Sequence, residues 1–255
     1  MKIAIIGAGA YGTALGEVLI EKNYQVDYYD PLILPTKLDK VLSGAEITLL
    51  AAPSFALADL LPGLPKDRPL VVATKGVLSD KVFSDFSNVM VLSGPGFADD
   101  IKAHHKTFLT ITDKELEKLF GVDYLEFDYT SDTKGVLMCG ALKNVYAILA
   151  GYLGVLPGNE EYDSFITDVA EEMQALLSAN GAEPSTVNLY CGIGDLRLTC
   201  DTPSRNYQYG SELKKDANYQ PEMTVEGLST LELIRDGEIV VPDNTPKLKQ
   251  LLEII

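Results

Sequence analysis

A glycine-rich turn near the N-terminus constrains the fold of this chain more than any other feature. The β-rich run Lys2–Ile6 leads directly into Gly7-Ala8-Gly9-Ala10-Tyr11-Gly12, which matches the pattern G-x-G-x-x-G. A helical pattern follows from Ala10 to Lys22, and Asp30 ends the next β-rich run. This order of strand, glycine turn, helix, strand and acidic residue predicts the first βαβ unit of an open α/β sheet.

Each of these residues has a role in binding a dinucleotide. Gly7 permits the tight turn, Gly9 lets a pyrophosphate approach the backbone, and Gly12 lets the helix pack closely on the strand. Asp30 is placed where a carboxylate accepts hydrogen bonds from an adenosine ribose, although an aspartate here also caps a following turn. A glycine turn without a ligand explains the glycines but not the whole pattern, so we favour dinucleotide binding.

The first half of the chain alternates β-rich runs with helical stretches, which is typical of a parallel sheet covered on both faces. Each early strand ends in a small or polar cluster, and ligands of open α/β sheets bind at the carboxyl ends of strands. After the strand Gln25–Tyr29, the expected strands are Glu46–Ala51, Leu70–Ala73, Val89–Leu92, Lys106–Ile111 and Tyr124–Phe127.

Helical patterns dominate the second half. The expected helices are Asp132–Leu153, Tyr162–Ala179, Tyr207–Lys215, Val225–Asp236 and Thr245–Glu253. We therefore expect an α/β protein in which a Rossmann dinucleotide-binding domain at residues 1–130 is followed by an all-helical substrate and catalytic domain at residues 131–255.

The charge of the chain excludes two classes of partner. It has 37 acidic and 21 basic side chains, a formal net charge of −16. Nucleic acids and anionic membranes bind surfaces rich in Lys and Arg, so neither is expected as a partner. Val136–Val155 has the length of a membrane span, but Lys143 and Asn144 at its middle favour the core helix of a soluble domain. Glycines interrupt the apolar N-terminal run soon after Ile6, which argues against a signal peptide.

Cysteine and histidine usage points to the cytoplasm and to no metal site. The three cysteines, Cys139, Cys191 and Cys200, have the number and spacing of neither a disulfide framework nor a zinc site. His104 and His105 are adjacent and point in different directions on a strand or helix, so we interpret them as a solvated pair.

A single lysine in an apolar helix is the next informative residue. Lys143 lies in the run from Leu137 to Val145, which is apolar on nearly every face, beside Gly140 and Asn144. Burying an unpaired ammonium costs several kcal/mol or lowers its pKa until it is neutral. A lysine here is therefore in a structural ion pair or in a working site, and the small and amide neighbours favour the site.

Two further clusters offer partners for charged groups. Asp195, between Gly194 and Leu196, reads as a carboxylate inside the protein that must find a cation or hydrogen-bond donors. Ser204-Arg205-Asn206 opens a helix and offers a hydroxyl, a guanidinium, an amide and backbone N–H groups, which together suit a phosphate. An ordinary N-cap beside a solvated arginine explains the second cluster equally well.

Seven motifs resemble those of the NAD(P)-dependent glycerol-3-phosphate dehydrogenases. They are Gly7-Ala-Gly-Ala-Tyr-Gly-Thr-Ala14, Ala73-Thr-Lys-Gly76, Ser93-Gly-Pro-Gly-Phe-Ala98, Cys139-Gly-Ala-Leu-Lys-Asn-Val145, Gly192-Ile-Gly-Asp-Leu-Arg-Leu-Thr-Cys200, Ser204-Arg-Asn206 and Val225-Glu-Gly227. Each is modest alone, but they occur in the family's order over most of the chain. The resemblance implies a Rossmann domain followed by a helical domain.

The resemblance also implies roles for individual residues. Lys143 matches the family's proton-transferring lysine, and Asp195 would orient its ammonium. Together with the glycine turn, the expected cofactor-binding residues are Gly7, Gly9, Ala10, Tyr11, Gly12, Asp30, Lys75, Ala98, Arg205 and Glu226. The expected substrate-binding residues are Lys75, Gly94, Lys143, Asn144, Asp195, Thr199, Ser204, Arg205 and Asn206.

The implied reaction is reversible hydride transfer between a nicotinamide and dihydroxyacetone phosphate, which gives sn-glycerol 3-phosphate, a precursor of glycerophospholipids. The expected cofactor is NAD, with NADP as the alternative, the substrate is a small phosphorylated molecule, and a homodimer is left open. One other candidate is a reductase of a related keto or hydroxy acid, such as ketopantoate, which has no need of Ser204-Arg205-Asn206. Another is a catalytically silent, dinucleotide-binding redox sensor.

The chain departs from the family in four places. It has little between Asp30 and Glu46, it stops early after Leu252, and Gly96 stands where many bacterial members have threonine. Glu161-Tyr162-Asp163 and Thr167-Asp168-Val169 replace an Asn-x-Arg run and an arginine before a glycine. The last replacements affect a segment tied to substrate closure or to the subunit interface, and they motivate the silent alternative.

Overall fold

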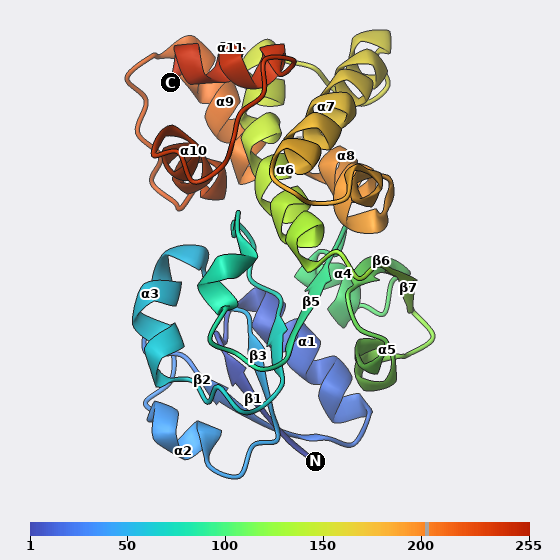
Figure 1. Ribbon diagram of the computed structural model, residues 1–255, viewed down its shortest axis with the longest axis vertical. Helices are drawn as coiled ribbons and strands as arrows, with labels where there is room; N and C mark the ends of the chain where they lie inside the picture. The colour runs from blue at the N-terminus through green and yellow to red at the C-terminus, as the bar shows by residue number, and fades with distance from the viewer. Residues whose placement is uncertain (202–203) are drawn as a thin grey trace. The chain divides into compact units, whose positions relative to one another are not determined.

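The computed structural model describes residues 1–201 and 204–255, and within them the chain divides into two compact units (Figure 1). The first unit is Met1–Lys75 with Asp80–Thr133, and the second is Gly76–Ser79 with Lys134–Ile255. The first unit carries all of the strands, and the described part of the second is helical.

A seven-stranded sheet with the order β2-β1-β3-β4-β5-β6-β7 forms the first unit. The strands are β1 (Lys2–Ile6), β2 (Gln25–Tyr29), β3 (Ile47–Leu50), β4 (Leu70–Val72), β5 (Val89–Ser93), β6 (Thr107–Ile111) and β7 (Leu125–Tyr129). From β1 the chain passes to β2 on one side of β1 and then to β3 on its other side. The pairings of β1 with β2, of β1 with β3 and of β3 with β4 are all parallel. The turn after β1 therefore lies where the strand order reverses, which is the usual ligand position in such sheets.

The sheet is not parallel throughout, and here the sequence prediction was wrong. β6 runs antiparallel to β5, with Leu92 opposite Ile111 and Ser93 opposite Thr110, and β7 is again parallel to β6. Apolar periodicity predicts where a strand lies but carries no information on its direction. Because β6 begins at the edge where β5 ends, the chain between them does not return along the length of the sheet.

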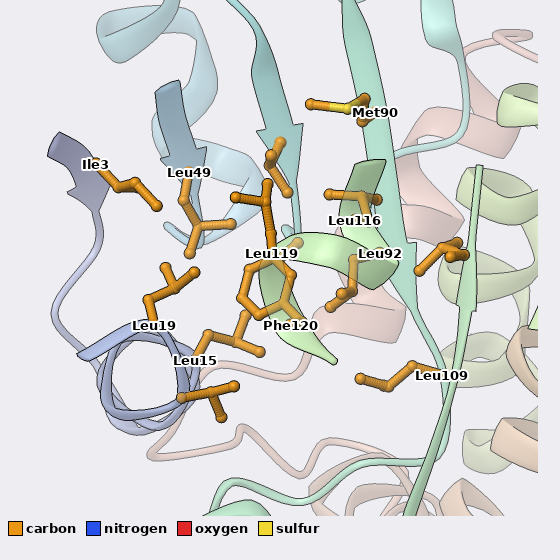
Figure 2. Packing of buried hydrophobic residues seen from close by; sticks show 14 of the residues in the cluster. Ile3, Leu15, Leu19, Leu49, Met90, Leu92, Leu109, Leu116, Leu119 and Phe120 are labelled. Carbon is orange, nitrogen blue, oxygen red and sulfur yellow. The ribbon is translucent and has the colours of Figure 1, made fainter. Parts of the chain in front are cut away.

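Helices cover both faces of this sheet. They are α1 (Ala10–Glu21), α2 (Leu38–Leu42), α3 (Leu57–Leu60), α4 (Ala98–Lys102) and α5 (Glu115–Phe120), with short 3-10 turns η1 (Ser54–Ala56), η2 (Leu61–Gly63) and η3 (Asp80–Phe83). Figure 2 shows Leu15 and Leu19 of α1 with Leu119 and Phe120 of α5, all in the cluster that packs on one face. Successive side chains of a strand point to opposite faces of the sheet. Ala4 and Ile6 alternate with Ile3 and Ile5 of this cluster and are also fully buried, so the second face of the sheet is covered as well.

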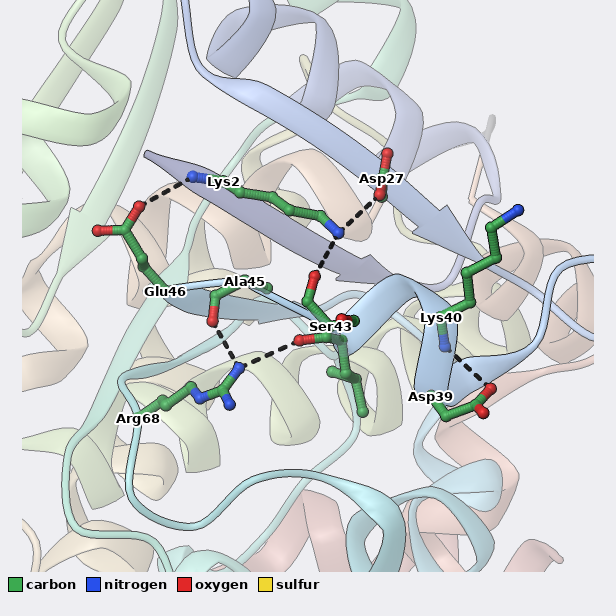
Figure 3. A network of polar contacts seen from close by, with 9 residues as sticks. Lys2, Asp27, Asp39, Lys40, Ser43, Ala45, Glu46 and Arg68 are labelled. Atoms are coloured by element: carbon green, nitrogen blue, oxygen red, sulfur yellow. Dashed lines mark hydrogen bonds and ion pairs between the residues drawn. The ribbon is translucent and has the colours of Figure 1, made fainter.

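Two cations hold the short segment between β2 and β3 (Figure 3). Lys2 Nζ lies 2.9 Å from a carboxylate oxygen of Asp27 and donates to the carbonyl of Ser43 at 2.6 Å. Arg68 Nη1 donates to the carbonyls of Leu42 and Ala45 at 3.1 and 2.5 Å. The last carbonyls of a helix lack intrahelical partners, so these side chains satisfy carbonyls at and just after the end of α2.

The second unit is built around one long buried helix. Its helices are α6 (Thr133–Leu153), α7 (Glu160–Ala179), α8 (Asp195–Thr199), α9 (Arg205–Lys215), α10 (Glu226–Arg235) and α11 (Pro246–Ile254), with a 3-10 turn η4 (Pro184–Asn188) and a π-type turn η5 (Tyr190–Gly194). Among the described residues α6 alone is long and apolar enough to cross a membrane, but 89% of that window is buried inside the protein. Its apolar surface is therefore matched by the helices around it, as the sequence indicated.

Paired glycines allow α6 and α9 to cross closely. A Cβ at Gly151 of α6 would overlap the carbonyl oxygen of Tyr207, and a Cβ at Gly210 of α9 would overlap that of Ile148. Each helix thus presents a glycine to the backbone of the other. This crossing fixes the first half of α9 against the last turns of α6.

A buried carboxylate attaches the C-terminal helix. Glu172 of α7 is 4% exposed and accepts the hydroxyl of Tyr146 at 3.0 Å. It also accepts the backbone N–H groups of Lys247 and Leu248 at 2.6 and 3.0 Å. These are first-turn donors of α11, which have no intrahelical partner. One side chain therefore joins α6, α7 and α11.

Candidate functional site

The glycine turn has the shape that a dinucleotide pyrophosphate requires. Gly7 has φ of +107°, and a Cβ there would lie 2.7 Å from the backbone of Ala51 and Ala52. A Cβ at Gly12 would overlap the carbonyl of Gly7, whereas no described atom lies within 4 Å of where a Cβ on Gly9 would stand. Gly9 is the N-cap of α1, so the helix begins without a capping side chain and without an acidic residue in its first turn. The residues present therefore fit an anionic group at the start of α1.

Asp30 binds the glycine turn and the loop that follows β2. Its Oδ2 accepts the backbone N–H of Ala8 at 3.0 Å, and its Oδ1 accepts that of Leu32 at 3.0 Å. Turn capping, which was the simpler interpretation of this residue, is therefore present. Each carboxylate oxygen has a second lone pair, so the same group can also accept a ribose hydroxyl.

Three other expected residues lie after the carboxyl ends of neighbouring strands. Lys75 follows β4, and its Nζ lies 5.2 Å from the centroid of the Tyr11 ring, within range of a cation–π interaction. Gly94 follows β5 and is buried, and Ala98 begins α4 with part of its surface exposed. Because β1, β4 and β5 are parallel, these residues share one edge of the sheet with the glycine turn.

In the second unit, Lys143 and Asp195 form a buried ion pair. The Nζ of Lys143, in the middle of α6, contacts Oδ2 of Asp195 at the start of α8, with side chains 3% and 1% exposed. Cys200, which follows α8, is fully buried, and burial raises the pKa of its thiol well above the usual range. The positive charge of Lys143 lowers this pKa, but by less than burial raises it. An ammonium held by a carboxylate away from water is a poised proton donor with a defined direction.

Asn144 is held by a chain of side-chain amides. Its Nδ2 donates to Glu226 Oε2 at 3.2 Å and to the Gly140 carbonyl at 3.3 Å. Its Oδ1 accepts Asn206 Nδ2 at 3.0 Å, and Asn206 Oδ1 accepts the N–H of Gly227 at 2.9 Å. The first turns of α9 and α10 thus meet at the residue next to Lys143. The sequence motifs named these residues, but the bridging role of Asn206 was missed because it depends on which helices pack together.

The start of α9 has both features that the sequence left open. Ser204 is its N-cap, with Oγ accepting the N–H of Tyr207 at 3.4 Å. Arg205 is exposed, whereas Asn206 is 8% exposed. Thr199, at the end of α8, donates its hydroxyl to the carbonyl of Asp195 at 2.6 Å. The second unit therefore holds two groups of contacts, Lys143–Asp195–Thr199 and Asn144–Asn206–Glu226, which meet at the chain neighbours Lys143 and Asn144. Arg205 is exposed at the start of α9.

Sequence reasoning also missed Tyr162 and Asp163 of α7, which it treated only as departures from the family. The Tyr162 hydroxyl donates to the Arg197 carbonyl at 2.9 Å, and Asp163 Oδ1 accepts Arg197 Nη1 at 2.9 Å. Both contacts hold the helix that carries Asp195. The unusual residues at 162 and 163 were visible in the sequence. Their partner, Arg197, could not be identified because it lies more than thirty positions along the chain.

Comparison with known proteins identifies the family. Residues 132–241 match the family described as the NAD-dependent glycerol-3-phosphate dehydrogenase C-terminus. The glycerol-3-phosphate dehydrogenase [NAD(P)+] of Desulfotalea psychrophila is 31% identical over 312 aligned positions, which cover 99% of this chain and 92% of that protein. The chain belongs to the glycerol-3-phosphate dehydrogenase family. The corresponding protein of Cereibacter sphaeroides is 34% identical, over 92% of this chain and 87% of its own length.

Solved structures of the dehydrogenase family share this fold. The crystal structure of glycerol-3-phosphate dehydrogenase from Coxiella burnetii has a TM-score of 0.81 and 27% identity, covering 98% of this chain and 94% of that one. The Staphylococcus aureus ketopantoate reductase covers the whole chain with a TM-score of 0.54 and 14% identity, which shows a shared fold alone. The Rossmann and helical architecture expected from the sequence is confirmed.

Proposed function

We propose that this protein interconverts dihydroxyacetone phosphate and sn-glycerol 3-phosphate with a nicotinamide dinucleotide. The observation that carries the proposal is the buried Lys143–Asp195 pair. The chain also belongs to the glycerol-3-phosphate dehydrogenase family, and its glycine turn leaves room for a dinucleotide. The first unit is then the cofactor domain and the second the substrate domain.

The dinucleotide would be held mainly by the first unit. Gly7, Gly9 and Gly12 admit its pyrophosphate, the first turn of α1 at Ala10 and Tyr11 supplies N–H donors, and Asp30 accepts the ribose hydroxyls. By family resemblance, Lys75, Ala98, Arg205 and Glu226 complete the set of contacts. When bound, the nicotinamide supplies or accepts the hydride.

Lys143 transfers the proton to and from the substrate oxygen. As the carbonyl carbon of the substrate is reduced, its oxygen gains negative charge, and the ammonium of Lys143 donates a proton to that oxygen. Asp195 fixes the direction of the lysine, because its carboxylate contacts the ammonium of Lys143. In the reverse direction the neutral amine accepts the proton from the C2 hydroxyl.

The phosphate and hydroxyl groups of the substrate need separate partners. Arg205 is the exposed cation at the start of α9, and Ser204 and the first-turn N–H groups lie beside it, which suits a phosphate dianion. Thr199 bonds Asp195, and Asn206 bonds Asn144, the chain neighbour of Lys143, so we assign these three side chains to the hydroxyl and carbonyl end of the substrate. Lys75 and Gly94 are proposed to contact the substrate from the first unit, with Lys75 adding positive potential.

Two features support placing this reaction in the cytoplasm. The three cysteines are buried, and no disulfide occurs in the described part of the chain. The reaction uses a nicotinamide cofactor and yields a phosphorylated product suited to glycerophospholipid synthesis. We therefore propose a cytoplasmic enzyme.

Loss of reduced-nicotinamide absorbance on addition of dihydroxyacetone phosphate tests the function. We expect turnover with this substrate and much slower turnover with ketopantoate, which carries no phosphate. Faster turnover of ketopantoate would support the keto-acid reductase instead. Tight cofactor binding by calorimetry, without turnover of either substrate at high protein concentration, would support the silent binding protein.

A further inference from the structure

The helix that carries Asp195 is too short to hold itself in place. α8 has only five residues, and one of its few closing bonds is from the N–H of Cys200 to the Leu196 carbonyl at 2.8 Å. The last carbonyls of a helix have no intrahelical partner, so the carbonyl of Arg197 must be satisfied from elsewhere. The direction of the Asp195 carboxylate therefore depends on what holds α8 from outside.

The first turn of α7 supplies that support at two points. The ring of Tyr162 is buried, its hydroxyl donates to the Arg197 carbonyl at 2.9 Å, and the Arg197 guanidinium lies 5.9 Å from the ring centroid. Asp163 pairs with the same guanidinium at 2.9 Å. Adjacent residues of α7 thus hold both the backbone and the side chain of Arg197, two positions after Asp195.

We propose that Tyr162, assisted by Asp163, is a positioning residue for the Lys143–Asp195 pair, and this rests on the proposed function. The contacts come from the first turn of α7 and reach α8 at Arg197, two positions after Asp195. Tyr162 carries the main effect because its bond is shielded, whereas the Asp163–Arg197 pair is largely exposed and such pairs are weak.

The hydroxyl of Tyr162 keeps its proton in the conditions of catalysis. Burial raises the pKa of Tyr162 to about 12, and neighbouring Cys200 and the carboxylates add to the increase. The group is therefore a permanent donor to the Arg197 carbonyl. A Phe in its place preserves the packing of the ring and removes only this bond.

The Tyr162→Phe variant of the full chain tests the proposal. We expect kcat for dihydroxyacetone phosphate to fall about tenfold, because small displacements of a catalytic group cost large factors in rate. KM for the reduced cofactor should not change, since Tyr162 does not belong to the cofactor set. Asp163→Asn should lower kcat by a smaller factor, of about two to three, since the pair is exposed.

Asp168→Asn is a matched control on the same helix. Asp168 also pairs with a cation, Lys247, at 3.0 Å, but that partner lies on α11 and has no contact with α8 among those described. Its kcat should equal that of the wild type. An equal fall in kcat for Asp163→Asn and Asp168→Asn would mean that only the general stability of α7 is being measured.

Hydrogen–deuterium exchange supplies a readout that does not depend on turnover. In Tyr162→Phe the amides at residues 196–200 should lose protection, while those in the middle of α6 should keep it. Unchanged kcat, or unchanged exchange at residues 196–200, would overturn the proposal. A wild-type protein with no activity on dihydroxyacetone phosphate would instead refute the proposed function, and the exchange experiment would still decide whether Tyr162 holds α8.

Discussion

At the scale of single residues, the buried Lys143–Asp195 pair contributes to both stability and catalysis, and the two contributions can be measured separately. Removing one partner of a buried ion pair leaves an uncompensated charge and typically costs about 3–5 kcal/mol. Lys143→Met should therefore lower the free energy of unfolding. It should also lower kcat about 100-fold or more, because the positioned proton donor is lost. Cofactor affinity, measured by fluorescence or calorimetry, should stay close to that of the wild type.

A double variant separates the two effects. Lys143→Met combined with Asp195→Asn removes both charges, so it should recover part of the lost stability without recovering activity. Near-normal kcat in Lys143→Met would show that the pair is structural, and the assigned mechanism would then be wrong.

Arg205 is the residue on which substrate recognition is expected to depend. Arg205→Ala removes a charge-assisted contact worth about 1.5–3 kcal/mol, so KM for dihydroxyacetone phosphate should rise roughly tenfold to a hundredfold. Affinity for the nicotinamide cofactor should change much less. Arg235→Ala, which removes another exposed guanidinium, from the end of α10, is the control and should leave both quantities unchanged. Equal weakening of substrate and cofactor would mean that Arg205 serves the cofactor as much as the substrate phosphate, and its assignment as the main phosphate ligand would be wrong.

Asp30 is expected to favour NAD over NADP, because its carboxylate would repel a 2′-phosphate. The residues from Pro31 to Pro35 include no Arg or Lys, and Lys37 is the first cation. Asp30→Asn is the milder variant, since its single amide oxygen keeps one of the two backbone N–H bonds, whereas Asp30→Ala would leave both Ala8 and Leu32 without this acceptor. The ratio of kcat/KM for NADH to that for NADPH should fall roughly tenfold in Asp30→Asn. A wild type that prefers NADPH would disprove this assignment.

At the scale of elements, the crossing of α6 and α9 leaves no room for a larger side chain at either glycine. In Gly210→Ala the new methyl group would meet the Ile148 carbonyl, which is backbone and cannot rotate away. Overpacking of this kind costs about 1–3 kcal/mol, so urea denaturation should show a lower midpoint. Ser211→Ala, one position along the same helix, should change the midpoint little. Equal effects of the two substitutions would mean that the helices do not cross as described.

Element positions were largely readable from the sequence, while the contacts between elements were not. β1 and β2 have the predicted bounds, because a glycine turn and Asp30 end them. Strand direction at β6 and the amide chain through Asn206 depend on tertiary packing, which a local pattern does not encode. Lys143 was predicted to need a partner because an apolar helix cannot bury a lone ammonium. Tyr162 carries no such signal, since a tyrosine on a helix is ordinary by itself.

At the scale of the whole molecule, the net charge of −16 opposes the compact state. Raising KCl from about 10 mM to about 300 mM shortens the range of this repulsion, so the thermal midpoint should rise by a few degrees. The sequence pI is about 4.5, so the same titration near pH 5.5, where the charge is smaller, should give a smaller rise. A midpoint that falls with salt would indicate that surface ion pairs outweigh the general repulsion.

The way α11 is attached has a practical consequence for anyone preparing this protein. Both hydrogen bonds between Glu172 and α11 are made to the first turn of that helix, at Lys247 and Leu248. Ile255 lies at the opposite end of the helix. A purification tag joined after Ile255 would therefore extend from the far end and leave the attachment intact. Cutting the chain before Thr245 would instead leave a carboxylate in the interior with Tyr146 as its remaining described donor. Such a shortened protein would bury a carboxylate that has lost two of its three described donors, so its yield in expression should fall.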